Sequence, residues 1–197
     1  MKKYRFTQGG WYNIKAHVKV YNLSLIPIFS ALTAAGALIR IPVPPVPITL
    51  QSFFVIMSGI LLGPKAGAYS QIIYIIIGLI GLPVFSGGGG LSYVMKPTFG
   101  YLLGFICAAA VTGYIMRSRS FNTLTLFTAS IFGVLTIYFI GTTYLALYLL
   151  TIMQKPDAIG IAIKTGFLIF IPGDIVKCIV LALILSRVDL LKKLRQR

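Results

Sequence analysis

An acidic and a basic side chain stand three residues apart in front of the last apolar run of the chain. They are Asp174 and Lys177, in the segment FIPGDIVK, residues 170–177. A carboxylate and an ammonium at this spacing share one face of a helix, where they can bind a polar ligand through charge-assisted hydrogen bonds. Ionisable groups inside a membrane are costly and usually face a cavity that serves a ligand or an ion. We therefore interpret the pair as part of a ligand site, with an ion pair that only locks two helices together as the alternative.

The other reactive side chains do not combine into a catalytic or metal-binding set. His17 is the only histidine, and Cys107 and Cys178 lie in apolar runs without the paired spacing of a disulfide or a metal site. The chain lacks a phosphate-binding loop of the Gly-x-x-x-x-Gly-Lys-Ser/Thr type. No activated nucleophile and no second carboxylate accompany Asp174. We predict binding or transport rather than catalysis, with no cofactor and no metal ion.

A run of four glycines interrupts the apolar sequence in LPVFSGGGGLSY, residues 82–93. Glycine lets a backbone approach a ligand closely and expose its amides, and the neighbouring aromatic residues would supply apolar walls. A flexible surface loop is the alternative interpretation. The ligand-site candidates in and near this segment are Phe85, Ser86, Gly87, Gly88, Tyr93 and Lys96.

Two further features could serve either a ligand or a helix contact. Gln51 is a polar group near the end of an apolar run, where it could bind a ligand or a neighbouring helix. Ala31 and Ala35 place small residues four positions apart, which lets helices approach closely. We interpret these alanines as a contact for an external helical partner, with packing inside the same bundle as the alternative.

Six apolar runs separated by proline, glycine and basic residues predict six transmembrane helices, each of roughly 20 residues. They are residues 23–39, 48–62, 66–82, 99–116, 124–152 and 172–188. The segment 158–171 is apolar but short, and Gly160, Lys164 and Gly166 interrupt it. We predict that this segment forms an interfacial or re-entrant helix.

The composition is that of an integral membrane protein. Hydrophobic residues make up 57% of the 197 residues, charged residues 11%, and the mean hydropathy is +0.91. The net charge of +15 does not indicate nucleic acid, because most basic residues cluster at the termini and in the connections that the six spans put on one side. This asymmetry predicts that both termini are cytoplasmic. We predict a basic cytoplasmic segment over residues 1–22, one membrane domain over 23–190, and a basic cytoplasmic tail over 191–197.

This topology places three unusual segments together on the outer side of the membrane. They are the proline-rich connection 41–47, the glycine-rich connection 83–98 and the start of the last span with Asp174 and Lys177. We therefore expect an outward-opening pocket that these three segments line.

Several motifs, taken together, resemble the BioY family. They are IPVP and TLQ within 41–51, LLGPKAG at 61–67, GLPVFSGGGG at 81–90, KPTFGYLLGF at 96–105 and FIPGDIVK at 170–177. The resemblance extends from about residue 25 to residue 185. Members of this family are the biotin-specific substrate-binding (S) components of energy-coupling-factor (ECF) vitamin transporters.

The resemblance implies a six-helix bundle that binds biotin with high affinity near the outer face of the bacterial plasma membrane. It implies partners that power uptake, namely a transmembrane scaffold subunit and two cytosolic ATPases. Asp174 and Lys177 match the acid–lysine pair of the family's pocket, and Ala31 and Ala35 match its contact with the scaffold.

The chemistry of biotin suits such a pocket. Its ureido ring offers N–H donors and a carbonyl acceptor, so we expect Asp174 to accept an N–H and Lys177 to donate to the carbonyl. For the valerate carboxylate the candidates are Lys96, Arg40, Tyr93 and the amides of the glycine run. Two other functions remain open, which are a solitary or oligomeric biotin facilitator and a non-transport membrane scaffold protein.

Overall fold

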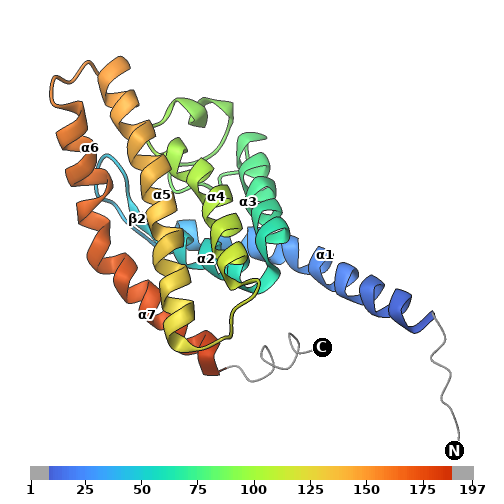
Figure 1. Cartoon of the computed structure of the whole chain (residues 1–197). Coiled ribbons are helices and arrows are strands. Elements are labelled where there is room, and N and C mark those ends of the chain that lie inside the picture. Colours follow the sequence, from blue (N-terminus) through green and yellow to red (C-terminus); the bar gives the residue numbers. More distant parts are fainter. Residues whose placement is uncertain (1–8, 188–197) are drawn as a thin grey trace, which may run out of the picture.

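The protein folds into a bundle of helices with one short β-hairpin. The computed structural model describes the backbone of residues 9–187 and the side chains of residues 24–187. Figure 1 shows α3, α4, α5 and α7 standing side by side, with the connections 63–64 and 117–122 at one end and the connections 80–98 and 152–157 at the other. In chain order the elements are α1 Gly9–Leu38, β1 Arg40–Ile41, β2 Ile48–Thr49, α2 Gln51–Leu62, α3 Pro64–Leu79, η1 Leu91–Met95, α4 Phe99–Met116, α5 Thr123–Thr151, α6 Ala158–Gly166, η2 Leu168–Phe170 and α7 Ile171–Arg187.

The predicted apolar runs form helices. Among residues 24–187, three helical stretches are long and apolar enough to cross a membrane, namely Phe99–Met116, Thr123–Thr151 and Ala158–Arg187. This confirms the prediction of an integral membrane protein that is mostly helical. The helices α2 and α3 have 12 and 16 residues, which is shorter than the roughly 20 residues of a typical span.

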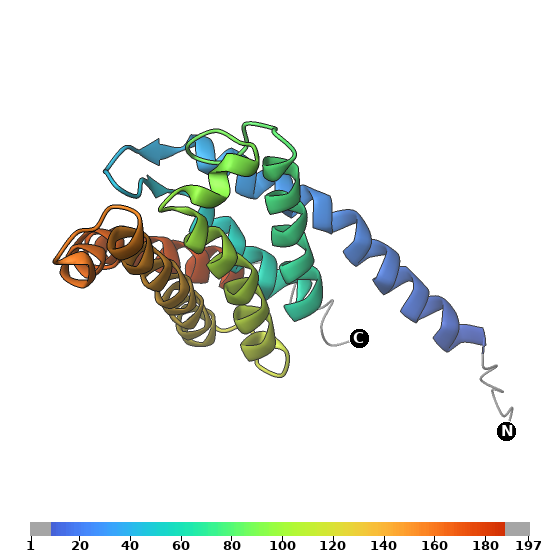
Figure 2. The same cartoon turned by 90° about the horizontal axis from the view of Figure 1, so that it is seen from above.

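The first helix is longer than the sequence predicted. It begins at Gly9 rather than at residue 23, so residues 9–22, which we had assigned to a basic cytoplasmic segment, continue the helix of the first span. Seen from above, α1 extends away from the bundle, and its last turns lie beside α3 (Figure 2). The remainder of the predicted N-terminal segment and the predicted tail 191–197 lie outside the described residues.

The segment 158–171 is not separate from the last span. The helix α6 leads through the short η2 directly into α7, and α6 packs along α5. The buried residues Ala158, Ala162 and Gly166 form a stripe of small side chains on the packed face of α6. The interruption expected at Gly166 coincides with the end of α6. Gly166 also permits close packing, because its carbonyl accepts a hydrogen bond from Tyr101 at 2.8 Å and a Cβ there would lie 2.3 Å from Tyr101 Oη.

The proline-rich connection folds into a hairpin that the sequence did not predict. Its strands β1 and β2 are antiparallel, with Arg40 opposite Thr49. The hairpin is held to the end of α1 because the Leu50 N–H donates to the carbonyls of Gly36 and Ile39, both at 3.1 Å. A side chain at Gly36 would stand 3.1 Å from the Leu50 carbonyl carbon, so glycine permits this close approach. The hairpin thereby brings Thr49 and the start of α2 to a defined place against the bundle.

Candidate functional site

A pocket lies where the hairpin, the 83–98 connection and the helices α4, α5 and α7 meet. The three segments that the sequence analysis expected to converge all contribute to its wall. The lining residues are Val46, Pro47, Thr49, Gln51, Ser52, Ser86, Tyr93, Thr98, Tyr101, Leu102, Phe105, Ile137, Tyr138, Phe170, Asp174 and Lys177. Most of this wall is aromatic or aliphatic, and its ionisable pair is at one place, which is typical of small-molecule sites.

Asp174 forms the centre of the polar wall. The residue lies in the first turn of α7 and is only 5% exposed. Oδ1 accepts hydrogen bonds from Lys177 Nζ at 2.6 Å and Ser52 Oγ at 3.0 Å, and Oδ2 accepts one from Tyr138 Oη at 2.6 Å. Buried charges are stable only when they are paired and hydrogen-bonded, and this carboxylate meets both conditions.

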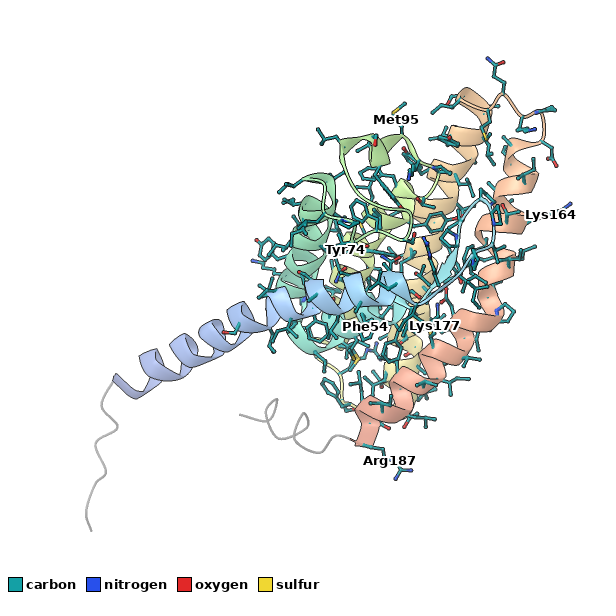
Figure 3. All side chains as sticks on the ribbon, turned by 180° about the vertical axis from the view of Figure 1, so that it is seen from behind. Phe54, Tyr74, Met95, Lys164, Lys177 and Arg187 are labelled. Atoms are coloured by element: carbon teal, nitrogen blue, oxygen red, sulfur yellow. The ribbon has the colours of Figure 1, made fainter. Side chains whose placement is uncertain are left out.

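Lys177 holds three segments of the chain together. Its ammonium donates to Asp174 Oδ1 at 2.6 Å, to the Thr49 carbonyl at 2.6 Å and to Ser52 Oγ at 3.1 Å. Since a lysine ammonium has three N–H groups, each of them has a partner within the protein. Figure 3 shows Lys177 on α7 beside the hairpin, whereas Lys164 higher on the same side points away from the bundle. The ion pair thus connects α7 both to α2 and to the end of β2.

Aromatic rings build the rest of the wall near the acid. The ring of Tyr138 lies edge-on to Phe167, with 5.0 Å between the ring centroids, and Tyr101 lies 6.3 Å from Phe170. The hydroxyl of Tyr101 donates to the Gly166 carbonyl, so it is committed to α6. Residues from α4, α5 and the end of η2 therefore surround the polar group with apolar surface.

The glycine-rich connection forms a separate corner of the pocket around Tyr93, which is only 1% exposed. The Tyr93 hydroxyl accepts from Thr98 Oγ1 at 3.1 Å and lies 3.4 Å from Ser86 Oγ. Phe85 packs against the Tyr93 ring, with 4.5 Å between centroids. Lys96 donates to the Gly87 carbonyl at 2.7 Å and lies 4.8 Å from the centroid of the Tyr93 ring. The connection is therefore an ordered turn stabilised by its own side chains.

The structure brings five of the predicted site residues to the pocket. Asp174, Lys177, Gln51, Ser86 and Tyr93 all line it. Gln51 combines both interpretations, because it lines the pocket and its Nε2 also donates to the Tyr74 hydroxyl of α3 at 2.6 Å.

Four other predicted residues do not line the pocket. Phe85 and Gly88 shape the turn behind its wall, where they pair as an isolated bridge, while Gly87 and Lys96 are exposed on the outside of that turn. Arg40, a candidate partner for a carboxylate, is exposed on β1.

Two residues of the polar cluster were missed by the sequence analysis. Ser52 and Tyr138 lie in apolar helices far along the chain from Asp174 and carry no distinctive local motif. A single hydroxyl within a predicted span is a weak signal, because hydroxyl residues are common in this chain, which has 11 tyrosines alone. Only the packing of α2, α5 and α7 identifies these two hydroxyls as partners of the acid.

Ala31 and Ala35 lie on the surface of α1. Both are exposed, whereas Phe29, Ser30 and Thr33 are buried. Ser30 faces α3, where its hydroxyl donates to the Ser70 carbonyl at 2.6 Å. The two alanines therefore lie on a face of α1 that does not pack within the bundle.

Comparisons with known proteins agree on one family. The sequence profile of the BioY family matches residues 12–193. A protein of Lysinibacillus sphaericus named probable biotin transporter BioY is 44% identical over 167 residues, which cover 84% of this chain and 85% of that protein. Biotin transporter BioY of Thermotoga maritima is 40% identical over 85% of this chain and 93% of its own length. A crystal structure of the S-component for biotin from an ECF-type ABC transporter is similar with a TM-score of 0.72 and 28% identity, covering 98% of this chain and 96% of that one.

Proposed function

Because the chain belongs to the BioY family, we propose that it is a biotin-binding membrane subunit that mediates biotin uptake. The observation that carries the proposal is the buried carboxylate of Asp174, which lines a pocket with aromatic and aliphatic walls. Biotin combines an apolar bicyclic ring with a polar ureido group, and this combination matches a pocket of that kind. Biotin is the transported substrate and not a cofactor.

In this proposal the ureido ring binds at the polar wall and the valerate chain extends toward the corner around Tyr93. Asp174 accepts a ureido N–H, and Lys177 and Gln51 complete that end of the pocket. Ser86 and Tyr93 contact the ligand from the glycine-rich connection. Phe85, Gly87, Gly88 and Lys96 contribute by keeping that connection closed over the pocket, an assignment supported by the bond from Lys96 to the Gly87 carbonyl.

We propose that the helices form six spans in the bacterial plasma membrane with both termini in the cytoplasm. The connections 63–64 and 117–122 lie at the end of the bundle opposite the glycine-rich connection (Figure 1). Exposed basic residues in or next to these connections support this orientation, namely Lys65, Arg117 and Arg119. Arg187 is also exposed and lies at the end opposite Met95 of the glycine-rich connection (Figure 3). The pocket then opens toward the outside, where biotin is captured.

The energy for uptake comes from partner subunits in this proposal. The chain docks on an ECF scaffold subunit associated with two cytosolic ATPases, an arrangement supported by the similarity to an S-component of an ECF-type transporter. The exposed alanines of α1 are the proposed contact with the scaffold, because small residues let a partner helix approach closely. A facilitator that works without the module is the alternative, and it predicts uptake in cells that lack the ATPases.

Enlarging the two alanines separates binding from uptake. We expect the double variant Ala31→Leu/Ala35→Leu to bind biotin within about threefold of the wild type and to lose at least about tenfold in module-dependent uptake, because the bulkier residues block helix approach. The measurements are binding in detergent and uptake of labelled biotin by cells that carry the module. Cys107→Leu, a similar enlargement at an exposed position of α4, is the control and should leave uptake intact. Normal uptake by the double variant would contradict the proposed contact.

The proposed function is tested first by equilibrium binding of biotin to the purified chain in detergent. We expect saturable binding with one site per chain, and no competition from lipoic acid, which lacks a ureido group. Unfolding of the protein should also shift to higher temperature as biotin is added, since a ligand that binds only the folded state stabilises it. A folded sample without binding would reject the biotin assignment and favour the scaffold protein.

A further inference from the structure

The hydrogen bonds around Asp174 leave few positions at which a ligand can bind. An ionised carboxylate has about four lone-pair sites, two on each oxygen. Oδ1 already accepts from Lys177 and from Ser52, so both of its sites are used. Oδ2 accepts only from Tyr138 among the described residues and keeps one site for a ligand. A ligand N–H therefore meets Asp174 at Oδ2.

Most hydrogen-bond donors around the carboxylate also have acceptors within the protein already. All three N–H groups of Lys177 are engaged, one of them with the Thr49 carbonyl and one with Ser52. Redirecting any of them to a ligand would give up a hydrogen bond that already exists within the protein, which costs free energy. The Ser52 hydroxyl donates to Oδ1 rather than to Oδ2. Lys177 is thus a positioning residue that orients Asp174 and the hairpin.

The hydroxyl of Tyr138 is different because it can change its partner by a simple rotation. Its oxygen is 2.6 Å from Asp174 Oδ2, and both residues line the pocket. A phenolic O–H can turn from Oδ2 toward a ligand while the ring stays in place. Oδ2 then loses one donor and gains the ligand N–H, so the number of hydrogen bonds to the acid is conserved.

We propose that Tyr138 is a specificity-determining residue that donates its hydroxyl to the carbonyl of a cyclic urea whose adjacent N–H binds Asp174 Oδ2. In a cyclic urea, an N–H and the carbonyl lie next to each other on one edge of the ring and point the same way. The neighbouring pair of Oδ2 and the Tyr138 hydroxyl offers the matching acceptor and donor on one wall. This inference rests on the proposed function and differs from the sequence-based expectation that Lys177 reads the carbonyl.

The ring of Tyr138 is fixed independently of its hydroxyl. It packs against Phe167, with 5.0 Å between centroids, and near Phe170, at 6.4 Å. Tyr138→Phe therefore removes the hydroxyl and keeps the apolar contacts. Tyr101→Phe is a matched control, because Tyr101 also lines the pocket but its hydroxyl donates to the Gly166 carbonyl.

The test measures binding of biotin and of 2-thiobiotin, in which sulfur replaces the carbonyl oxygen and accepts hydrogen bonds more weakly. We expect Tyr138→Phe to weaken biotin binding about tenfold, as for a lost hydrogen bond that leaves a buried acceptor unpaired. We also expect the preference for biotin over 2-thiobiotin to fall from at least about tenfold in the wild type to within about threefold in this variant. A change in preference measures the contact itself, since the mutation and the analogue remove the same bond. Tyr101→Phe should leave the preference at its wild-type value.

The outcomes are separable. A wild-type protein that binds no biotin would reject the proposed function itself. If the wild type binds biotin and Tyr138→Phe weakens both ligands by the same factor, Tyr138 only positions Asp174 and the inference is wrong. Unchanged biotin binding by a folded Tyr138→Phe would also overturn it. Thermal unfolding of each variant without ligand shows whether the fold is retained.

Discussion

Asp174→Asn is expected to weaken biotin binding by at least about tenfold, because a charge-assisted hydrogen bond contributes roughly 1.5–3 kcal/mol. The amide cannot offer the same charged acceptor at Oδ2, and it places a donor within a cluster where Lys177, Ser52 and Tyr138 already donate. Titration of the purified variant with labelled biotin measures the change.

The control for this substitution is another acid of the same chain. Only three acidic residues are present, and Asp157 lies exposed at the start of α6, away from the pocket. Asp157→Asn should therefore bind biotin as the wild type does. Unchanged affinity in the Asp174 variant would mean that the acid–lysine pair has a structural role only.

Lys177→Met is expected to lower the free energy of unfolding by about 3–5 kcal/mol, as found when one partner of a buried ion pair is removed. Methionine has similar length but supplies no charge and no donor, so Asp174 keeps only Ser52 and Tyr138. The Thr49 carbonyl also loses its bond, and with it the hairpin loses a tie to α7. Thermal or denaturant unfolding in detergent, without biotin, measures this effect.

A second substitution separates the structural role of the pair from its role in binding. Replacing both members of a buried ion pair is often much less costly than replacing one. We expect Asp174→Asn/Lys177→Met to recover part of the stability that Lys177→Met loses, while biotin binding stays at least as weak as in Asp174→Asn. Recovery of both stability and binding would favour the simple helix lock. No recovery of stability would indicate that Lys177 acts mainly through the hairpin.

Several features of the protein could be predicted because they are local in the chain. A run of apolar residues demands a membrane helix wherever it packs, so α4 at Phe99–Met116 agrees with the predicted span 99–116. An acid and a lysine at i and i+3 meet on any helix, and here their charged atoms are 2.6 Å apart. A charge inside an apolar run needs partners, and this predicted that Asp174 would mark a site before its partners were known.

Local patterns were incomplete where glycine and proline have more than one physical use. Gly166 is the last residue of α6, as an interruption at this position implies, and it also lets this end of the helix pack closely against Tyr101. The prolines of 41–47 indicated an irregular connection, yet β1 and β2 pair across it because the backbone of Leu50 is anchored on α1. In both cases a contact with a distant segment decides the conformation.

The sequence by itself determined that this protein is an integral membrane protein of the BioY type and that an acid, the proposed ligand contact, lies in its last helix. Hydropathy, charge and motifs are local properties, so they can be read without knowing the fold. The tertiary structure alone decided which hydroxyls surround that acid, since Ser52 is 122 residues and Tyr138 is 36 residues from Asp174 along the chain. Buried polar groups must find hydrogen-bond partners, but packing decides which ones they find. In the packing observed here, all three N–H groups of Lys177 have partners within the protein. The Tyr138 hydroxyl donates to Asp174, and in our proposal it rotates toward the ligand.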